Sequence, residues 1–307
     1  MSLALGLIRG VMRGTVKPFF GVVRSVLVLR ASLVLASVLF PLPFGVTVRR
    51  ARLGPRDAVW FTRAGEDSAG PILFWLHGGA HFSGSAFTHR GMLGRLALAC
   101  DCAVVVPEFR RAPEHPLPAA LEDAVAAFDA LCASGVRPDR VVLGGDSSGG
   151  GLALALLARL EAEGRRVAGL VLLSPWLDMT LSGASIRDNA GSDPLIPLVR
   201  IVEAVELVRG AEPVDGPVAS PLFAPFRAAC PALVSVGTTE LLLDDSRRLA
   251  ARWRDLGGRL DLVCLPGAPH VLAFLAPWVP ESRAEIRRIA GFVRDCLAAQ
   301  LVLTVSR

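Results

Sequence analysis

Residues 141–151 read Val-Val-Leu-Gly-Gly-Asp-Ser-Ser-Gly-Gly-Gly. The apolar start of this stretch predicts a β-strand, and the apolar helical pattern that follows predicts a helix. A serine at such a turn adopts a strained backbone, and glycines two positions before and after it prevent the strand and the helix from colliding. Gly145 and Gly149 stand at those positions. The stretch predicts a nucleophile at Ser147, although a pattern of five letters also arises by chance.

A glycine-rich turn follows an earlier apolar run. Residues 76–80 read Leu-His-Gly-Gly-Ala, directly after Pro-Ile-Leu-Phe-Trp. Attack on an ester carbonyl builds negative charge on its oxygen, and each fixed N–H donor aimed at that oxygen lowers the barrier by about 3 kcal/mol. We therefore predict an oxyanion hole formed by the backbone of Gly78, Gly79, Ala80 and Ser148. Taken alone, the motif would favour an ordinary glycine-rich turn, but its pairing with the stretch around Ser147 removes that preference.

A late histidine is placed to act as the base. A serine nucleophile needs a base with a near-neutral pKa, which histidine provides. His270 follows a predicted strand at 260–265 and is the natural choice by order along the chain. The other histidines lie in or after the glycine-rich turn or between two prolines: His77, His81, His89 and His115.

The acid that orients this histidine should follow the preceding strand, predicted at 232–237. Glu240 is the first carboxylate after that strand, and we predict it as the acid. Asp244 is the alternative; Asp244 and Asp245 open the next helix, where the helix dipole favours acids without any catalytic role. The order serine, acid, histidine is that of α/β-hydrolases.

Strand and helix patterns alternate along the rest of the chain, which favours one α/β domain with a mostly parallel eight-stranded sheet and helices on both faces. The predicted strands are 46–51, 57–62, 71–76, 103–107, 140–145, 168–173, 232–237 and 260–265. The predicted helices are 88–100, 118–133, 148–163, 246–257 and 281–300.

These motifs resemble the bacterial hormone-sensitive-lipase-like esterases, α/β-hydrolases named for a Gly-Asp-x-Gly motif. The resemblance spans about residue 40 to the C-terminus and rests on 77–79, 107–116, 145–150, 174–178 and the segments around Glu240 and His270. It implies a serine carboxylesterase for short- to medium-chain esters, with Ser147, Glu240 and His270 as the triad. It also implies a homodimer formed around Leu260–Cys264 and Glu281–Leu301.

The chain departs from this family at several positions. Ala80 stands where the family has a third glycine; its N–H remains available. Phe109 replaces a tyrosine and so lacks a hydroxyl, and Arg111 adds a charge that needs solvent or an acidic partner. The acid is a glutamate where many relatives have aspartate.

Residues 178–230 are too long for a simple crossover and contain six prolines around one helical stretch. We predict that they form a cap insertion over the nucleophile, and the resemblance implies that residues 1–45 pack with it, ahead of a catalytic domain at 46–307. Asp193-Pro194-Leu195 resembles the family's acid motif but precedes the required strand, so we interpret it as a loop turn.

The positive charge is concentrated at the N-terminus. Residues 1–56 hold eight arginines, Lys17 and no acid, a net charge of +9, whereas the whole chain carries +5. The apolar 26–40 stretch is interrupted by Arg30 and followed by Pro41 and Pro43. Three interpretations stay open: a cap helix, an anchor on an anionic membrane surface, and a cleaved signal. The basic residues alternate with Leu and Val, which argues against nucleic-acid binding.

The six cysteines indicate neither a disulfide scaffold nor a metal site, and we infer no cofactor. Small buried cysteines are typical of a reducing compartment, so we expect a cytoplasmic protein that is either free or membrane-associated. Two alternatives to an esterase remain: an amidase or deacetylase of a small acetylated metabolite, and a non-catalytic ligand-binding module. The presence of serine, acid and histidine argues against the latter.

Overall fold

The computed structural model describes residues 1–65 and 70–305. Its described part contains one eight-stranded sheet in the order β1-β2-β4-β3-β5-β6-β7-β8. The strands are β1 (Val46–Leu53), β2 (Arg56–Arg63), β3 (Ile72–Leu76), β4 (Ala103–Pro107), β5 (Val141–Asp146), β6 (Gly169–Leu173), β7 (Ala232–Gly237) and β8 (Leu260–Leu265). β1 and β2 are antiparallel to their neighbours and the remaining pairs are parallel, which confirms the predicted fold class.

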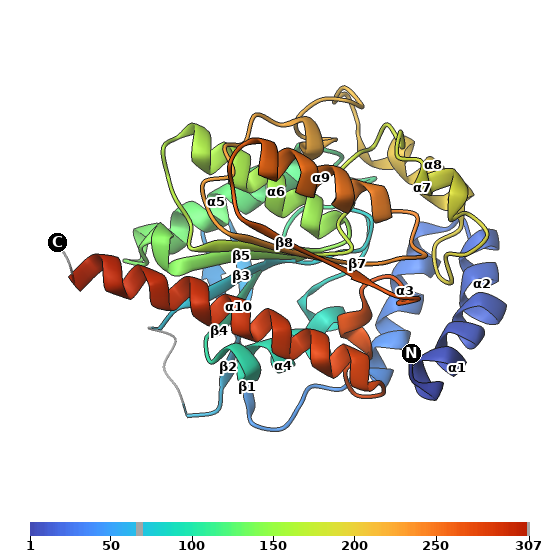
Figure 1. Ribbon diagram of the computed structural model, residues 1–307, viewed down its shortest axis with the longest axis horizontal. Helices are drawn as coiled ribbons and strands as arrows, with labels where there is room; N and C mark the ends of the chain where they lie inside the picture. The colour runs from blue at the N-terminus through green and yellow to red at the C-terminus, as the bar shows by residue number, and fades with distance from the viewer. Residues whose placement is uncertain (66–69, 306–307) are drawn as a thin grey trace.

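Helices cover both faces of the sheet (Figure 1). α5 (Ala119–Ala133), α6 (Ser148–Ala162) and α9 (Leu243–Asp255) share one hydrophobic core with the sheet, whereas α4 (Ala86–Cys100) and α10 (Pro280–Val305) share the other. In β3, Phe74 belongs to the first core and Trp75 to the second, because successive strand residues point to opposite faces. A parallel strand buried on both faces is apolar throughout, which is why the strand predictions come so close to the structure.

The largest boundary differences are in α10, which continues to Val305 instead of residue 300, and in α9, which begins at Leu243 instead of residue 246. Asp244 and Asp245 lie in its first turn, where they complement the positive end of the helix dipole.

The N-terminal segment, residues 1–45, folds into several short helices whose individual bounds the sequence pattern does not predict. They are α1 (Leu3–Val11), a π-helical turn (Met12–Val16), α2 (Lys17–Val22), α3 (Val26–Ala36) and a 3₁₀ turn (Ser37–Leu39). The cap insertion contains the short α7 (Ser185–Asp188) and α8 (Leu198–Val208). Within the described residues, no helix is both long and apolar enough to cross a membrane.

The N-terminal segment packs against the cap insertion, as Figure 1 shows for α2 and α8. Lys17 Nζ donates hydrogen bonds to the carbonyls of Ala190 (2.8 Å) and Asp193 (2.7 Å). Arg200 of α8 donates to the carbonyl of Gly21 at 3.0 Å. Segments that are more than 170 residues apart are therefore joined through charge-assisted hydrogen bonds.

Candidate active site

Ser147 lies between β5 and α6 in a strained conformation, with φ 53° and ψ −126°. A Cβ on Gly145 would lie 2.3 Å from the carbonyl oxygen of Gly149, and one on Gly149 would lie 2.1 Å from that of Leu76. Only glycine fits at either position, because contacts this short are sterically forbidden. The backbone of Ser147 is also anchored, since its N–H donates to the Leu173 carbonyl at 2.8 Å.

His270 and Glu240 form a buried pair. His270 Nδ1 lies 2.6 Å from Glu240 Oε2, and the Glu240 side chain is fully buried. Burial acts to lower the pKa of His270, but the hydrogen bond and the charge of Glu240 outweigh it, so the pKa is raised above its ordinary value. With Nδ1 held by the carboxylate, Nε2 is the ring nitrogen left to exchange a proton.

The opposite oxygen of Glu240 is held as well. Glu240 Oε1 accepts hydrogen bonds from Ser174 Oγ (2.8 Å) and from the N–H of Gly237. Ser174 Oγ in turn accepts from the N–H of Val271, the residue after His270, at 3.0 Å. Ser174 therefore connects the carboxylate to the histidine loop, a role that no sequence motif had indicated.

Sheet topology brings these residues to one edge. Ser147, Ser174, Glu240 and His270 follow the parallel strands β5, β6, β7 and β8, so all four lie at the carboxyl ends of adjacent strands. This is the edge where open α/β sheets bind ligands. The charge of Asp146, the residue before Ser147, also raises the pKa of His270, which indicates that the histidine lies near the serine turn.

The glycine-rich turn packs directly against Ser147. A Cβ on Gly78 would lie 3.0 Å from Ser147 Cβ, and Ser148 Oγ accepts a hydrogen bond from the N–H of His81 at 3.1 Å. Gly79 and Ala80 have φ values of 122° and 51°. In the part of the chain that the structure describes, their N–H groups donate to no protein acceptor. They are therefore free to bind an oxygen beside the serine.

A buried polar cluster around Asp146 packs against the glycine-rich turn. Asp146 accepts from Trp75 Nε1 at 2.9 Å and lies 3.1 Å from His89 Nε2. Burial acts to raise the pKa of Asp146, but the facing His89 and these hydrogen bonds lower it overall. Asp146 and His89 were not predicted to have such a role, because neither belongs to a recognisable catalytic spacing.

The histidines of the glycine-rich turn are not suited to act as bases. Burial, assisted by the neighbouring His89, lowers the pKa of His77 to about 3, and burial alone lowers that of His81 to about 4. His77 stacks on Phe109 with ring centroids 4.3 Å apart, so the phenyl ring that replaces the family's tyrosine packs against the turn.

Arg111 has a hydrogen-bond acceptor that the sequence did not predict. Its guanidinium donates to the carbonyl of Gly84, so a backbone oxygen serves where solvent or an acid was expected.

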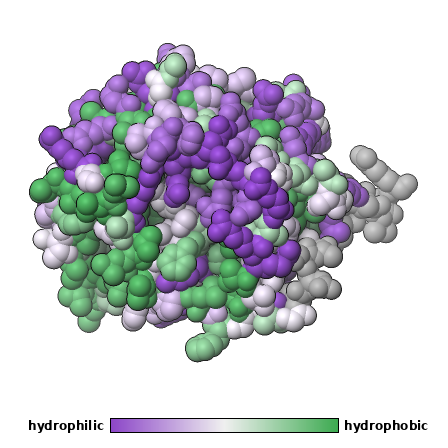
Figure 2. Space-filling model, turned by 180° about the vertical axis from the view of Figure 1, so that it is seen from behind, coloured by the Kyte–Doolittle hydropathy of each residue, from purple (hydrophilic) through white to green (hydrophobic). Residues whose placement is uncertain are grey.

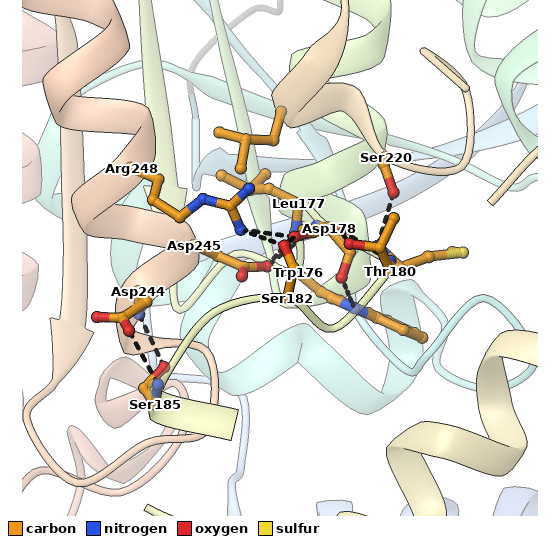
Figure 3. A network of polar contacts seen from close by, with 12 residues as sticks. Trp176, Leu177, Asp178, Thr180, Ser182, Ser185, Ser220, Asp244, Asp245 and Arg248 are labelled. Atoms are coloured by element: carbon orange, nitrogen blue, oxygen red, sulfur yellow. Dashed lines mark hydrogen bonds and ion pairs between the residues drawn. The ribbon is translucent and has the colours of Figure 1, made fainter. Parts of the chain in front are cut away.

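Asp244, the alternative acid, contacts neither His270 nor Ser147. Its carboxylate accepts from the N–H of Ser185 at 2.9 Å and pairs with Arg247 at 3.2 Å. Figure 3 shows Asp244 facing Ser185, on the cap insertion. Asp244 thus attaches the insertion to α9.

Asp245 and Asp178 fix the start of the cap insertion (Figure 3). Asp245 accepts from the N–H groups of Leu177 (2.8 Å) and Asp178 (3.1 Å), and burial raises the pKa of Asp245 to about 7. Asp178 pairs with Arg248 at 2.5 Å. Here the motif at 174–178 serves to attach the insertion to α9.

Asp193 forms the predicted loop turn, accepting from the N–H groups of Leu195 and Ile196, but it does more than that. It is fully buried, and its second oxygen accepts from the N–H of Leu241, next to Glu240, at 2.9 Å. The turn therefore links the insertion to the loop that carries the candidate acid.

Comparisons with known proteins agree with this architecture. A family model described as an alpha/beta hydrolase fold matches residues 73–274. The chain is 34% identical over 258 residues to an esterase of Acinetobacter venetianus, which covers 83% of this chain and 84% of that one. It is 36% identical over 244 residues to an acetyl-hydrolase of Streptomyces hygroscopicus, covering 79% and 81% of the two chains.

Solved structures extend the match to nearly the whole chain. The crystal structure of an esterase from the bacterial hormone-sensitive lipase family superimposes with a TM-score of 0.90 at 36% identity, covering 97% of this chain and 99% of that one. The protein is therefore a hydrolase of the α/β-hydrolase fold and belongs to the esterases of the bacterial hormone-sensitive lipase family.

Proposed function

We propose that the protein is a serine carboxylesterase that hydrolyses short- to medium-chain carboxylic esters through a Ser147–His270–Glu240 triad. The observation that carries this proposal is the buried His270–Glu240 pair, with its 2.6 Å contact, at the same sheet edge as the strained Ser147. The names of the relatives, which include esterase and acetyl-hydrolase, support the reaction class.

In the proposed mechanism, His270 Nε2 removes the proton from Ser147 Oγ as that oxygen attacks the ester carbonyl carbon. The carbonyl oxygen becomes negatively charged and is stabilised by the N–H groups of Gly79, Ala80 and Ser148. His270 then gives the proton to the leaving alkoxide, which departs as the alcohol and leaves an acyl-enzyme.

Water completes the cycle. His270 takes a proton from water, the resulting hydroxide attacks the acyl carbon, and collapse of the second tetrahedral intermediate releases the carboxylic acid as Ser147 regains its proton. Glu240 orients the ring and stabilises the imidazolium throughout. Its other oxygen is held by hydrogen bonds from Ser174 and Gly237.

The preference for short and medium chains follows from the proposed lid. The N-terminal segment and the cap insertion are joined through Lys17 and Arg200, and the insertion is attached to the loop of Glu240 through Asp193. A lid held at several points limits the room above the serine, so long acyl chains should be poor substrates.

Removal of an acetyl group is a second candidate, because the relative from Streptomyces hygroscopicus is named an acetyl-hydrolase. The same residues could cleave an acetyl amide, with His270 protonating the leaving amine. Matched acetyl ester and acetyl amide substrates distinguish the two: the esterase proposal expects faster turnover of the ester, and cleavage of the amide alone would overturn it.

The direct test is hydrolysis of p-nitrophenyl esters from acetate to palmitate by the wild type and by Ser147→Ala. We expect activity in the wild type only, highest for short or medium chains. A folded wild type that cleaves none of these esters would refute the proposal, and a palmitate optimum would refute the chain-length assignment.

A further inference from the structure

The N-terminal helices expose an unusual amount of apolar surface. Among the described residues, most of the large apolar side chains that are exposed lie within the first 44 residues. We call the following set the N-terminal apolar surface: Leu3, Leu7, Val11, Phe19, Val22, Leu27, Val28, Val34, Leu35, Val38, Leu39 and Phe44. The α1–α3 side of the molecule, at the right of Figure 1, lies at the left of Figure 2, where hydrophobic side chains gather.

These helices use little of their apolar surface for packing. α3 contains no buried residue, and Leu5 is the only one in α1. Leu7, Leu27 and Leu35 are 73%, 72% and 75% exposed, values typical of charged surface side chains rather than leucines. Contiguous apolar patches of this kind on a folded protein mark sites of interaction with a partner or a membrane.

Two aromatic residues from elsewhere in the chain extend this surface. Trp278 is exposed, and its indole N–H donates to the carbonyl of Leu39 at 3.2 Å. Phe87 is also exposed and lies under the guanidinium of Arg90, which itself hydrogen-bonds to Ser37. Tryptophan, which has an apolar ring and a polar N–H, is favoured at the boundary between lipid and water.

The charge of this region selects one kind of occupant. Residues 1–56 contain nine cationic side chains and no carboxylate, although the rest of the chain is net negative. Four of the nine pair with carboxylates of later residues: Arg30, Arg50, Arg52 and Arg56. Arg13 and Arg24 are exposed among the apolar side chains. Two copies of this region facing each other would bring like charges together, whereas an anionic lipid surface complements both its charge and its hydrophobicity.

We propose that the N-terminal apolar surface docks the protein on the surface of an anionic phospholipid bilayer, with α1–α3 lying in the lipid–water interface. No described helix can cross the bilayer, so the protein would rest on one leaflet. Lys17 joins α2 to the cap insertion, so the same helices that contact lipid form part of the proposed lid. Docking would therefore bring the lid of the esterase to the membrane surface.

The test is co-sedimentation with phosphatidylcholine vesicles and with vesicles that also contain phosphatidylglycerol. We expect tighter binding to the anionic vesicles, weakened by added salt. The triple variant Leu7→Ser, Leu27→Ser, Leu35→Ser should lose at least roughly tenfold in partitioning. The variant Arg13→Gln, Arg24→Gln should lose about fivefold per arginine on anionic vesicles only.

The matched control is Phe223→Ser, Leu256→Ser, which removes two exposed apolar side chains outside the N-terminal segment and should leave binding unchanged. Ser147→Ala should bind like the wild type, so docking is tested separately from catalysis. Absence of wild-type binding, or equal loss in the control, would overturn the proposal. A dimer that the triple variant converts to monomers would instead identify the surface as a subunit interface and also overturn it.

Discussion

At the scale of single residues, the contacts of their carboxylates distinguish Glu240, the candidate acid, from Asp244. Glu240 lies against His270 in a fully buried site, whereas Asp244 lies against Ser185 and Arg247. Sequence could rank the two but could not decide between them, because both follow β7 within a few residues.

We therefore expect Glu240→Gln to lower kcat by roughly 100- to 10,000-fold, because the amide would neither stabilise the imidazolium nor hold the required tautomer. Asp244→Asn is the matched control. It weakens a contact between α9 and the cap insertion and should leave kcat within a few-fold of the wild type. Steady-state kinetics on p-nitrophenyl acetate measures both, and an active Glu240→Gln enzyme would disprove the assignment.

The raised pKa of His270 also predicts the pH dependence of activity. His270 must be neutral to act as the base, so kcat/KM should rise with pH through a pKa above that of an ordinary histidine. Removing the charge of Glu240 takes away the largest influence that raises the pKa of His270; burial still lowers it, and the weaker effects of Asp193 and Asp146 still raise it. The residual activity of Glu240→Gln should accordingly persist to lower pH than that of the wild type, and an unshifted pH–rate profile would contradict this.

At the scale of elements, the link between α2 and the cap insertion depends on one ammonium group. Lys17→Met keeps the aliphatic stem but removes hydrogen bonds to two carbonyls, at a cost of about 2 kcal/mol in the free energy of unfolding. It should also raise KM, because the proposed lid loses an attachment. Arg13→Met, an exposed cation in the same segment, is the control and should change stability by less than about 0.5 kcal/mol. Urea unfolding and KM values that are the same for both variants would argue against the link.

Elements were predictable to very different degrees. Buried strands are short apolar runs, so β4 and β7 have the predicted bounds. β8 also has them, although it is an edge strand and only partly buried. The bounds of the helices in the N-terminal segment could not be predicted. Apolar residues lie all along α3, and Pro18 lies at the start of α2, so the sequence shows no clear amphipathic period there. Contacts such as that between Ser174 and Val271, which are 97 residues apart, depend on the tertiary fold and leave no local signal.

At the scale of the whole molecule, a second buried carboxyl group couples stability to pH. Glu285 of α10 accepts a hydrogen bond from Ser235 Oγ at 2.5 Å, and burial, together with the charge of Glu240, raises the pKa of Glu285 to about 7. The folded protein thus holds a proton that the unfolded chain releases above about pH 4.3. The contribution of Glu285 to the free energy of unfolding is fully present below that pH and is lost as the pH rises through about 7.

Glu285→Gln should remove this contribution. Between pH 5 and pH 7.5, the wild type should lose more free energy of unfolding than the variant, by an amount on the order of 2 to 3 kcal/mol. The pKa of Asp245 is also raised to about 7, but Asp245 titrates over the same range in both proteins, so its contribution cancels in the comparison. Urea unfolding at the two pH values provides the measurement; parallel losses would exclude the role of Glu285.

The assembly state is a separate prediction at this scale. β8 is an edge strand of the sheet, so its outer side is available for the homodimer that the family resemblance implies. Sedimentation of a single 32.4 kDa species at micromolar concentration would contradict it.

Covalent labelling provides the most direct evidence on whether Ser147 is the nucleophile, as proposed. We would incubate the protein with an organophosphate ester such as diethyl p-nitrophenyl phosphate and locate the adduct by peptide mass spectrometry. We expect one diethylphosphoryl group per chain, on Ser147, with loss of esterase activity in proportion to labelling and no adduct in Ser147→Ala. Labelling of another residue, or full activity after labelling of Ser147, would contradict it.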